Sequence, residues 1–185
     1  MVRKPLPKSA SPTKPPPPPP ETPADRSKRI LSAHRRWVES EGNKGTRASL
    51  KAGTILGADL AEGSFREVNL RGAELEGAEL READLSEADL QGASMKGARL
   101  FGANLQSANL KGADLSQAHL LHANFQGADL SAAEFRGAVL QETNLQGAHL
   151  EGAKIEEADL VQANFHEAKL MNANLSYSKA FGAKF

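Results

Sequence analysis

The sequence predicts an all-β fold, a solenoid of short inward-packing strands separated by corners, with one helix before it. The main observation is a repeat of five residues, because every fifth position from Leu50 to Phe185 is apolar, 28 times in succession without a shift of phase. Two residues before each of these positions stands a small residue, which is alanine in 23 of the 28 cases. The residue between them is mostly Asp, Asn, Glu or Ser. The exceptions to alanine are Gly53, Gly63, Val68, Thr143 and Ser178.

A period of five indicates extended chain with corners rather than helix. A helix turns by about 100° per residue, so five residues rotate a side chain by about 140° and leave no continuous stripe. In extended chain, residues two apart point the same way. The odd fifth residue would turn the next pair outward unless the chain bends there, and glycine often stands at this bend. The corner glycines are Gly72, Gly77, Gly92, Gly97, Gly102, Gly112, Gly127, Gly137, Gly147 and Gly152.

The pattern Ala-(Asp/Asn)-Leu-X-X covers three quarters of the chain and resembles the bacterial pentapeptide-repeat protein family. The resemblance implies a right-handed quadrilateral β-helix with four pentads per coil. Four pentads make a coil of twenty residues, and two features of the sequence agree with a period of twenty. About seven coils at about 4.8 Å each would make a rod of roughly 34 Å. The asparagines are Asn104, Asn124, Asn144 and Asn164, and four of the five core phenylalanines, Phe65, Phe125, Phe165 and Phe185, lie in one twenty-residue column.

Three segments are predicted. Residues 1–23 form a Pro-, Lys- and Ser-rich basic arm with six successive prolines, which we expect to be disordered with polyproline-II character. The arm is either a stiff spacer or a ligand for an aromatic groove. Residues 24–45 form a capping helix and linker, and residues 46–185 form the β-helix. The segment AHRRWVESEGNKGTRASL also resembles the lead-in of many bacterial members of the family.

The helix is predicted from Ala24 to Glu41, with Asp25 capping its start and Gly42 following its end. Its apolar stripe is too short for a stable isolated helix, so it must pack on something. The open N-terminal end of the solenoid is the expected surface, because stacked repeats need a cap over their last layer. The stripe consists of Ile30, Leu31, His34, Trp37 and Val38.

The distribution of charge and the composition limit the chemistry and the location that we expect for this protein. The chain has 23 basic and 23 acidic residues, yet residues 1–49 carry a net charge of +7 and residues 50–185 one of −7. Cysteine is absent, which excludes disulfides and thiolate chemistry. We found neither a signal peptide nor a run long enough to span a membrane, so the expected location is cytoplasmic.

No sequence motif indicates catalysis, and a core of Leu, Phe and Ala leaves no cavity for a substrate. We therefore expect a non-enzymatic protein without cofactor or metal. His119 and His122 flank one corner, and Glu142 should lie one coil beyond His122. These side chains are either a metal or acid–base site or, more simply, solvated surface groups.

Acidic residues concentrate in the first coils. Some bacterial members of the family protect DNA gyrase by presenting a rod with the width and charge of DNA, so a DNA mimic that binds this type II topoisomerase is the alternative function. An ordinary solvated acidic surface is the other interpretation, and the chain lacks the projecting loops of the plasmid-borne members. The candidate mimic patch consists of Asp59, Glu62, Glu74, Glu76, Glu79, Glu82, Asp84, Glu87 and Asp89, and Glu67 is a tenth acid nearby.

One column of outward positions is unusually apolar. At steps of twenty residues it reads Ala61, Arg81, Phe101, Leu121, Gln141, Val161 and Phe181. On the same face Val139 replaces the expected Asp or Asn, so Phe101, Leu121, Val139 and Val161 are its candidate contact residues. Neighbouring coils lie about 4.8 Å apart, so these four residues should form a semi-continuous apolar strip. Aligned apolar residues suggest a binding face, although variation at loosely constrained positions also explains them.

The last coil departs from the repeat, because Tyr177 takes a corner, Ser178 replaces Ala and Ala180 replaces Leu. Tyr177, Phe181 and Phe185 form a candidate dimer end in this coil. Gyrase-protecting relatives dimerise through their C-terminal coils, and a monomer whose aromatics cover their own last coil is the alternative. The leading function is therefore a protein–protein interaction scaffold on a rigid rod. We expect a protein partner, a homodimer, and no direct contact with nucleic acid or membrane.

Overall fold

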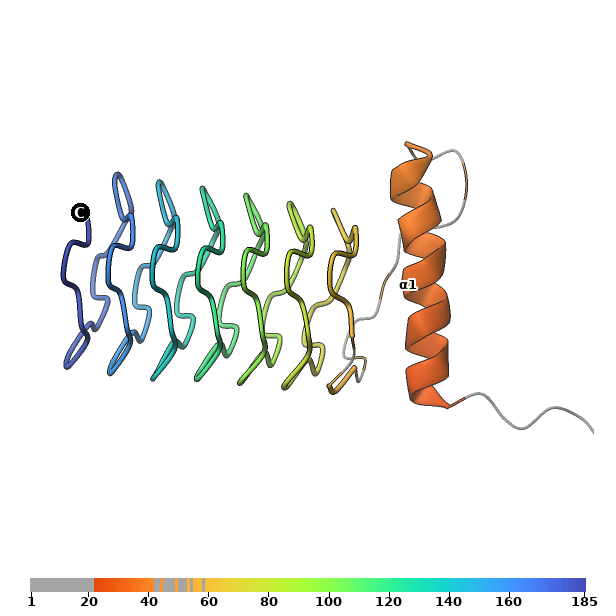
Figure 1. The fold of residues 1–185 in the computed structure, drawn as a ribbon, viewed down its shortest axis with the longest axis horizontal. Coiled ribbons are helices and arrows are strands. Elements are labelled where there is room, and N and C mark those ends of the chain that lie inside the picture. Colours follow the sequence, from red (N-terminus) through yellow and green to blue (C-terminus); the bar gives the residue numbers. More distant parts are fainter. Residues whose placement is uncertain (1–21, 42–43, 45–48, 50–52, 54, 58) are drawn as a thin grey trace, which may run out of the picture.

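The computed structural model describes residues 22–41, 44, 49, 53, 55–57 and 59–185. In this part of the chain one helix, α1 (Pro23–Glu39), precedes a regular stack of coils (Figure 1). Residues 1–21, Gly42 and most of the predicted linker lie outside the described residues. Within the described solenoid the expected strands are reduced to isolated parallel bridges, each joining residues twenty apart, from Ser49 with Asn69 to Asn164 with Lys184. One coil therefore contains four pentads.

The backbone of one pentad shows why five residues suffice for a strand and a corner. Leu105 N–H donates to the oxygen of Asn124 at 2.7 Å, and Asn124 N–H donates back to Ala103 at 2.9 Å. Ala108 N–H then closes a turn on the oxygen of Leu105 at 3.1 Å. Ser107, at the corner, takes the left-handed conformation with a φ of 57°. The left-handed corner restores the inward direction for the next pair.

Glycine occurs at the corners because it readily adopts the left-handed conformation, and not because space is limited there. At Gly112, with a φ of +65°, a Cβ would meet nothing within 4 Å. Other residues also take corner positions, such as Ala132 with a φ of 55° and Glu142 with a φ of 53°. For these residues the left-handed conformation costs about 1–2 kcal/mol.

The core is filled along the rod, because the repeated apolar and small residues point inward from all four sides. From Leu70 to Phe165 these side chains are buried, and Phe125 and Phe135 meet edge to face with ring centroids 6.4 Å apart. Departures from alanine fit their sites. A Cβ at Gly63 would clash with the ring of Phe65, and the buried hydroxyl of Thr143 donates to the oxygen of Leu120 at 2.9 Å.

A ladder of side-chain amides runs along one face of the rod. The Nδ2 atoms of Asn124, Asn144 and Asn164 each donate to the Oδ1 atom of the asparagine one coil earlier, over 3.0–3.2 Å. Asn104 donates in the same direction to Asp84 Oδ1 at 3.1 Å. Each rung thus binds two adjacent coils to each other, which explains the twenty-residue spacing of asparagine.

Helix α1 begins one residue earlier and ends two residues earlier than predicted. Its N-cap is Thr22, and Asp25 is the third helical residue of a capping box, in which each of the two side chains accepts a hydrogen bond from the other's backbone N–H. The prediction that Asp25 itself is the N-cap was wrong. Asp25 lies inside the first turn, and its own backbone N–H donates to the hydroxyl of the N-cap residue Thr22. The C-cap is Ser40.

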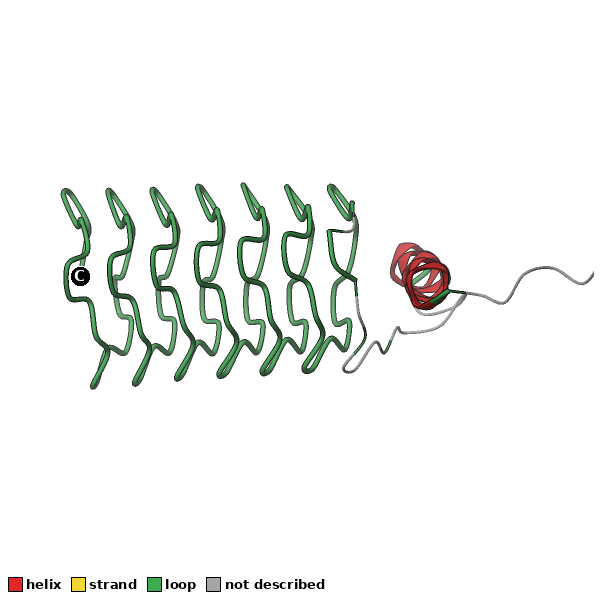
Figure 2. Ribbon diagram, turned by 90° about the horizontal axis from the view of Figure 1, so that it is seen from below, coloured by secondary structure: helices red, strands yellow, loops and turns green. Residues whose placement is uncertain are grey.

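α1 lies across the end of the coil stack opposite the C-terminus (Figures 1 and 2). Leu31 is 4% exposed and belongs to the same apolar core as the coils, with Ile30 packed against it. His34 is fully buried, and its Nε2 lies 2.9 Å from the backbone oxygen of Arg66. Trp37 stacks on His34 but is half-buried, as is Val38. The helix thus contacts the coils most closely through Leu31 and His34, and the other members of the predicted stripe are only partly buried.

Candidate functional site

The predicted apolar strip lies in register on successive coils. Backbone hydrogen bonds between adjacent coils fix this register. Gly102 N–H, next to Phe101, donates to the oxygen of Leu121, and Glu142 N–H donates to the oxygen of Val161. Phe101 is 38% exposed, and Leu121, Val139 and Val161 are partly exposed. All four predicted residues therefore reach the surface along one side of the rod.

Two features of the strip differ from a continuous apolar face. Gln141 stands between Leu121 and Val161, and its amide Nε2 donates to Asp159 Oδ2 at 2.8 Å. The strip is therefore interrupted by a polar contact. It also extends further than the four residues, since Gln162 N–H donates to the oxygen of Phe181, which puts that 84% exposed ring next in the column.

The histidine and glutamate at the corner beside the strip do meet. His122 Nδ1 lies 3.6 Å from Glu142 Oε2, and both side chains are about half exposed. The ring of Phe101 meets His122 edge on, with centroids 5.6 Å apart. Across the described residues, no group of three or more His, Cys, Asp or Glu side chains is placed to hold a metal ion. The corner thus provides one imidazole–carboxylate pair in contact with an aromatic ring.

The acidic residues of the first coils wrap around the rod instead of forming one patch. Asp59 and Glu79 are bridge partners on adjacent coils, so acids are stacked along the axis on that face. Several predicted acids are paired with arginines that lie about one coil away. These ion pairs are Arg99–Glu79 at 2.9 Å, Arg66–Glu87 at 2.7 Å and Arg71–Asp89 at 3.4 Å.

Hydrogen bonds engage two further acids, since Asp84 accepts from Asn104 and Glu76 from Ser94 Oγ at 3.0 Å. Asp59, Glu62, Glu74 and Glu82 are exposed. The arginines beside Glu79, Glu87 and Asp89 therefore offset part of the acidic charge of the first coils.

The C-terminal coil exposes several apolar side chains. Tyr177 is 90%, Phe181 84% and Phe185 64% exposed, as the candidate dimer end requires. Phe185 also stacks on the buried ring of Phe165, with centroids 5.0 Å apart and planes 4° from parallel. Met171, at 69% exposure, adds a side chain that the sequence analysis did not include.

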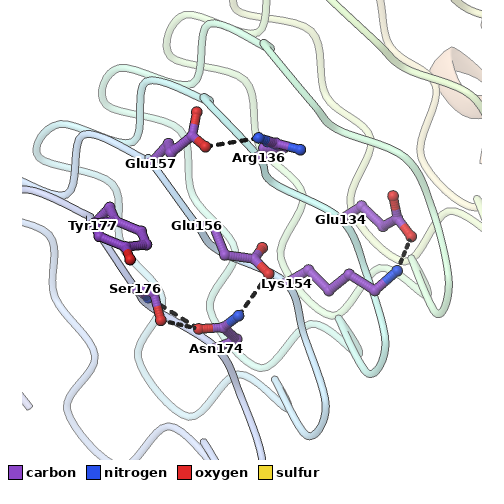
Figure 3. Close-up of a pocket in the computed structure, with 8 residues that line it drawn as sticks. All are labelled: Glu134, Arg136, Lys154, Glu156, Glu157, Asn174, Ser176 and Tyr177. Atoms are coloured by element: carbon purple, nitrogen blue, oxygen red, sulfur yellow. Dashed lines mark hydrogen bonds and ion pairs between the residues drawn. The ribbon is translucent and has the colours of Figure 1, made fainter.

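A polar groove of about 440 Å³ crosses one corner column near this end (Figure 3). Lys154 Nζ lies 2.6 Å from Glu134 Oε1, and Arg136 Nη2 lies 2.8 Å from Glu157 Oε1. Hydrogen bonds to these carboxylates raise the pKa of Lys154 and that of Arg136, so both cations stay charged. No local sequence pattern predicts this groove, because its ion-paired residues lie twenty or twenty-one positions apart on different coils. The other residues of the groove are Glu156, Asn174, Ser176 and Tyr177.

A carboxylate on another face has its charge stabilised by its own corner. Burial opposes ionisation of Asp129, but hydrogen bonds from Ser131 and the nearby charges of His149 and Lys111 hold the pKa of its carboxyl below the ordinary value. Asp129 Oδ1 accepts from the backbone N–H of Ser131 at 3.0 Å. The Asp position of the repeat thus fixes the corner that follows it.

Twenty-residue coils of four pentads around a filled apolar core define a β-solenoid repeat protein. The chain belongs to the pentapeptide repeat family, whose profile, Pentapeptide repeats, matches it in 8 copies over residues 64–102, 98–137, 118–156, 133–170 and 148–185. The solenoid is therefore the right-handed quadrilateral β-helix of that family. In the part of the chain that the structure describes, α1 is not long and apolar enough to cross a membrane. No curated protein matches the chain.

Solved structures of other pentapeptide repeat proteins resemble this one. Rfr23 from the cyanobacterium Cyanothece 51142 is 22% identical, with 71% of this chain and 90% of that chain covered and a TM-score of 0.45. QnrB1, a plasmid-mediated fluoroquinolone resistance protein, is 22% identical, with coverage of 75% and 77% and a TM-score of 0.49. The pentapeptide repeat protein alr5209 from Nostoc Pcc 7120 is 34% identical, with coverage of 57% and 83% and a TM-score of 0.30.

Proposed function

We propose that the chain is a non-catalytic scaffold for protein–protein interaction, in which a rigid rod of about seven coils presents the apolar strip to a partner. The observation that carries this proposal is the alignment of Phe101, Leu121, Val161 and Phe181 in one column, with Val139 beside it. Scattered exposed apolar residues are common on proteins, but an aligned set on a rigid surface is typical of a contact face. The filled core supports a role for the outer surface rather than the interior.

The ends of the rod have different roles in this proposal. α1 caps the N-terminal end, because Leu31 and His34 cover the first coils. A second copy of the chain covers the C-terminal end, where Tyr177, Phe181 and Phe185 are exposed. The rod acts in the cytoplasm, and the Pro-rich arm serves as a spacer.

A capture experiment with matched variants tests the strip. Leu121→Glu with Val161→Glu places two charges in the strip, and Gln106→Glu with Gln126→Glu places two charges at equivalent corner positions of another column. We expect the wild type and the Gln variant to retain a partner from the source cell, also in high salt, and the strip variant to lose it. A partner that the strip variant retains would exclude the strip as the contact.

DNA mimicry is the second candidate function. Stacked acids on adjacent coils favour it, since Asp59 pairs with Glu79 and the corner acids Glu62 and Glu82 also lie one coil apart. DNA carries one charge per about 1.7 Å of helix axis, and acids of the rod approach this density in the first coils. A supercoiling assay of a gyrase at low salt tests it, with Glu62→Gln and Glu82→Gln as the variant. No effect of micromolar wild type would exclude this function.

A further inference from the structure

The backbone carbonyls of the apolar strip are already used inside the rod. The oxygen of Gln141, at the middle of the column, accepts from His122 N–H at 3.1 Å. The other four carbonyls of the column accept in the same way from the coil before, namely those of Phe101, Leu121, Val161 and Phe181. An extended peptide that adds a strand to a sheet needs main-chain acceptors as well as donors. A partner must therefore bind the strip through side chains.

An α-helix is suited to such a surface, because it satisfies its own backbone and docks through one apolar face. Adjacent coils lie about 4.8 Å apart, so the five positions from Phe101 to Phe181 span about 19 Å. At about 1.5 Å per residue, the first, fourth, eighth, eleventh and fifteenth residues of a helix form one stripe about 21 Å long. Each turn of this helix can therefore face one coil of the strip.

Gln141 faces the middle residue of that stripe, whichever way the helix runs. Its Nε2 donates to Asp159 Oδ2 at 2.8 Å, which fixes the amide in place. A glutamine amide also has a second N–H and a carbonyl oxygen. An apolar residue over them would leave them unsatisfied, whereas an amide or hydroxyl of the partner would bond to them. One polar contact within an apolar seam sets the register of a helix.

Acidic side chains lie on both sides of Gln141. Glu142 is exposed at the following position, and Asp159 is partly exposed on the adjacent coil. His122 Nδ1 lies 3.6 Å from Glu142 Oε2, and the imidazole offsets that charge only when it is protonated. Residues 50–185 carry a net charge of −7. Lysines or arginines along the edges of a docked helix would therefore be attracted to the rod.

We propose that the partner of the strip is a basic amphipathic helix of about fifteen residues, which lies along the rod with one turn on each coil and a polar residue over Gln141. This rests on the proposed function, because it names the partner of the same strip. Phe181 is shared with the candidate dimer end, so the other positions of the column make most of the contact.

The test measures binding of fluorescent peptides of about fifteen residues to the full chain by anisotropy. The first peptide has leucine at the first, fourth, eleventh and fifteenth positions, asparagine at the eighth, and lysine and alanine elsewhere. The second has leucine at the eighth position, and the third has the residues of the first in an order that scatters its leucines around the helix. The protein variants are Gln141→Leu, the strip variant Leu121→Glu with Val161→Glu, and the matched control Gln126→Leu at an equivalent corner of another column.

We expect the first peptide to bind the wild type and to become helical on binding, because a helix of this length is marginal alone in water. It should bind at least about fivefold more tightly than the second peptide, which leaves the amide of Gln141 unsatisfied. Gln141→Leu should reverse this preference, Gln126→Leu should keep it, and the strip variant should lose binding. Circular dichroism follows the helix, and melting temperatures check that each variant is folded.

No binding of the first peptide to the wild type at about 1 mM would overturn the proposal. Equal binding of the first and third peptides, or undiminished binding to the strip variant, would do the same. A preference that Gln141→Leu leaves unchanged would refute the contact over Gln141. Capture of a partner that the strip variant loses, with no binding of the first peptide, would refute the helix and leave the proposed function standing. A captured partner that the strip variant retains would refute both.

Discussion

The Nε2 atom of His34 lies 2.9 Å from the backbone oxygen of Arg66, and no part of the His34 side chain is exposed. This contact joins α1 to the first coils by a hydrogen bond from within the apolar stripe of the helix. The oxygen of Arg66 lies at a corner, where the backbone turns away from the core. A histidine in an apolar stripe is therefore satisfied by the solenoid itself.

Replacing His34 should release the helix from the coils. We expect His34→Ala to reduce the free energy of unfolding of the α1 contact by about 2–3 kcal/mol, because a buried ring and a hydrogen bond are both lost. Trp37 fluorescence should shift toward the emission of a water-exposed indole. Arg36→Ala, on the outward side, is the control, and an unchanged Trp37 signal in His34→Ala would contradict the role of His34.

The left-handed corners offer a second test. Ala132 has a φ of 55°, so Ala132→Gly removes a cost of about 1–2 kcal/mol at the corner, against about 0.5–1 kcal/mol of added chain entropy. We expect a small rise in melting temperature. The neighbouring Ala133 is fully buried, and Ala133→Gly should lower the melting temperature. A fall for both variants would show that corner conformation does not limit stability.

The amide ladder gives a third prediction. Asn124 donates to Asn104, accepts from Asn144 and also accepts from the backbone N–H of Gln126. Asn124→Ala should therefore lower the free energy of unfolding by about 1–3 kcal/mol in chemical denaturation. The exposed side chain of Gln126 is the control, since Gln126→Ala keeps the backbone N–H. Equal stability of the two variants would mean that the ladder contributes nothing.

The candidate dimer end is tested by sedimentation. We expect the wild type to sediment as a dimer at high micromolar concentration and Phe181→Asp with Phe185→Asp as a monomer, because aromatic side chains bury about 150–250 Å² each in an interface. Gln106→Asp with Gln126→Asp, on the side of the rod, should remain dimeric. A monomeric wild type would refute the dimer.

The arm and the start of α1 should respond differently to change. Residues 1–21 have a composition with little apolar surface, so their deletion should shift the melting temperature by less than about 2 °C.

Thr22→Ala removes the N-cap and should cost the helix about 1 kcal/mol. Circular dichroism follows both, and a large drop on deletion would show that the arm packs on the rod.

For the candidate surfaces, the sequence predicts the positions of the residues on the coils but not the contacts between their side chains. The positions of Phe101, Leu121, Val139 and Val161 follow from counting in twenties, because each coil repeats the register of the one before. The contact between Gln141 and Asp159, which interrupts the strip, does not follow, since it depends on the rotamer of one long side chain. The ion pair between Arg99 and Glu79 does not follow either. The sequence places the two residues one coil apart, but it does not specify that their side chains meet.

The sequence by itself determined the solenoid. A pentad of one large apolar residue, one small residue and a corner can bury its core in one way, and 28 repeats without a phase shift fix the register of every coil. Tertiary structure alone decided how α1 meets that solenoid. The stripe of Ile30, Leu31, His34, Trp37 and Val38 states that the helix must pack, but which of them is buried depends on the shape of the coil end. That shape brings the oxygen of Arg66 to His34 and leaves Trp37 half-buried, because the contact joins residues 32 positions apart that no local pattern relates.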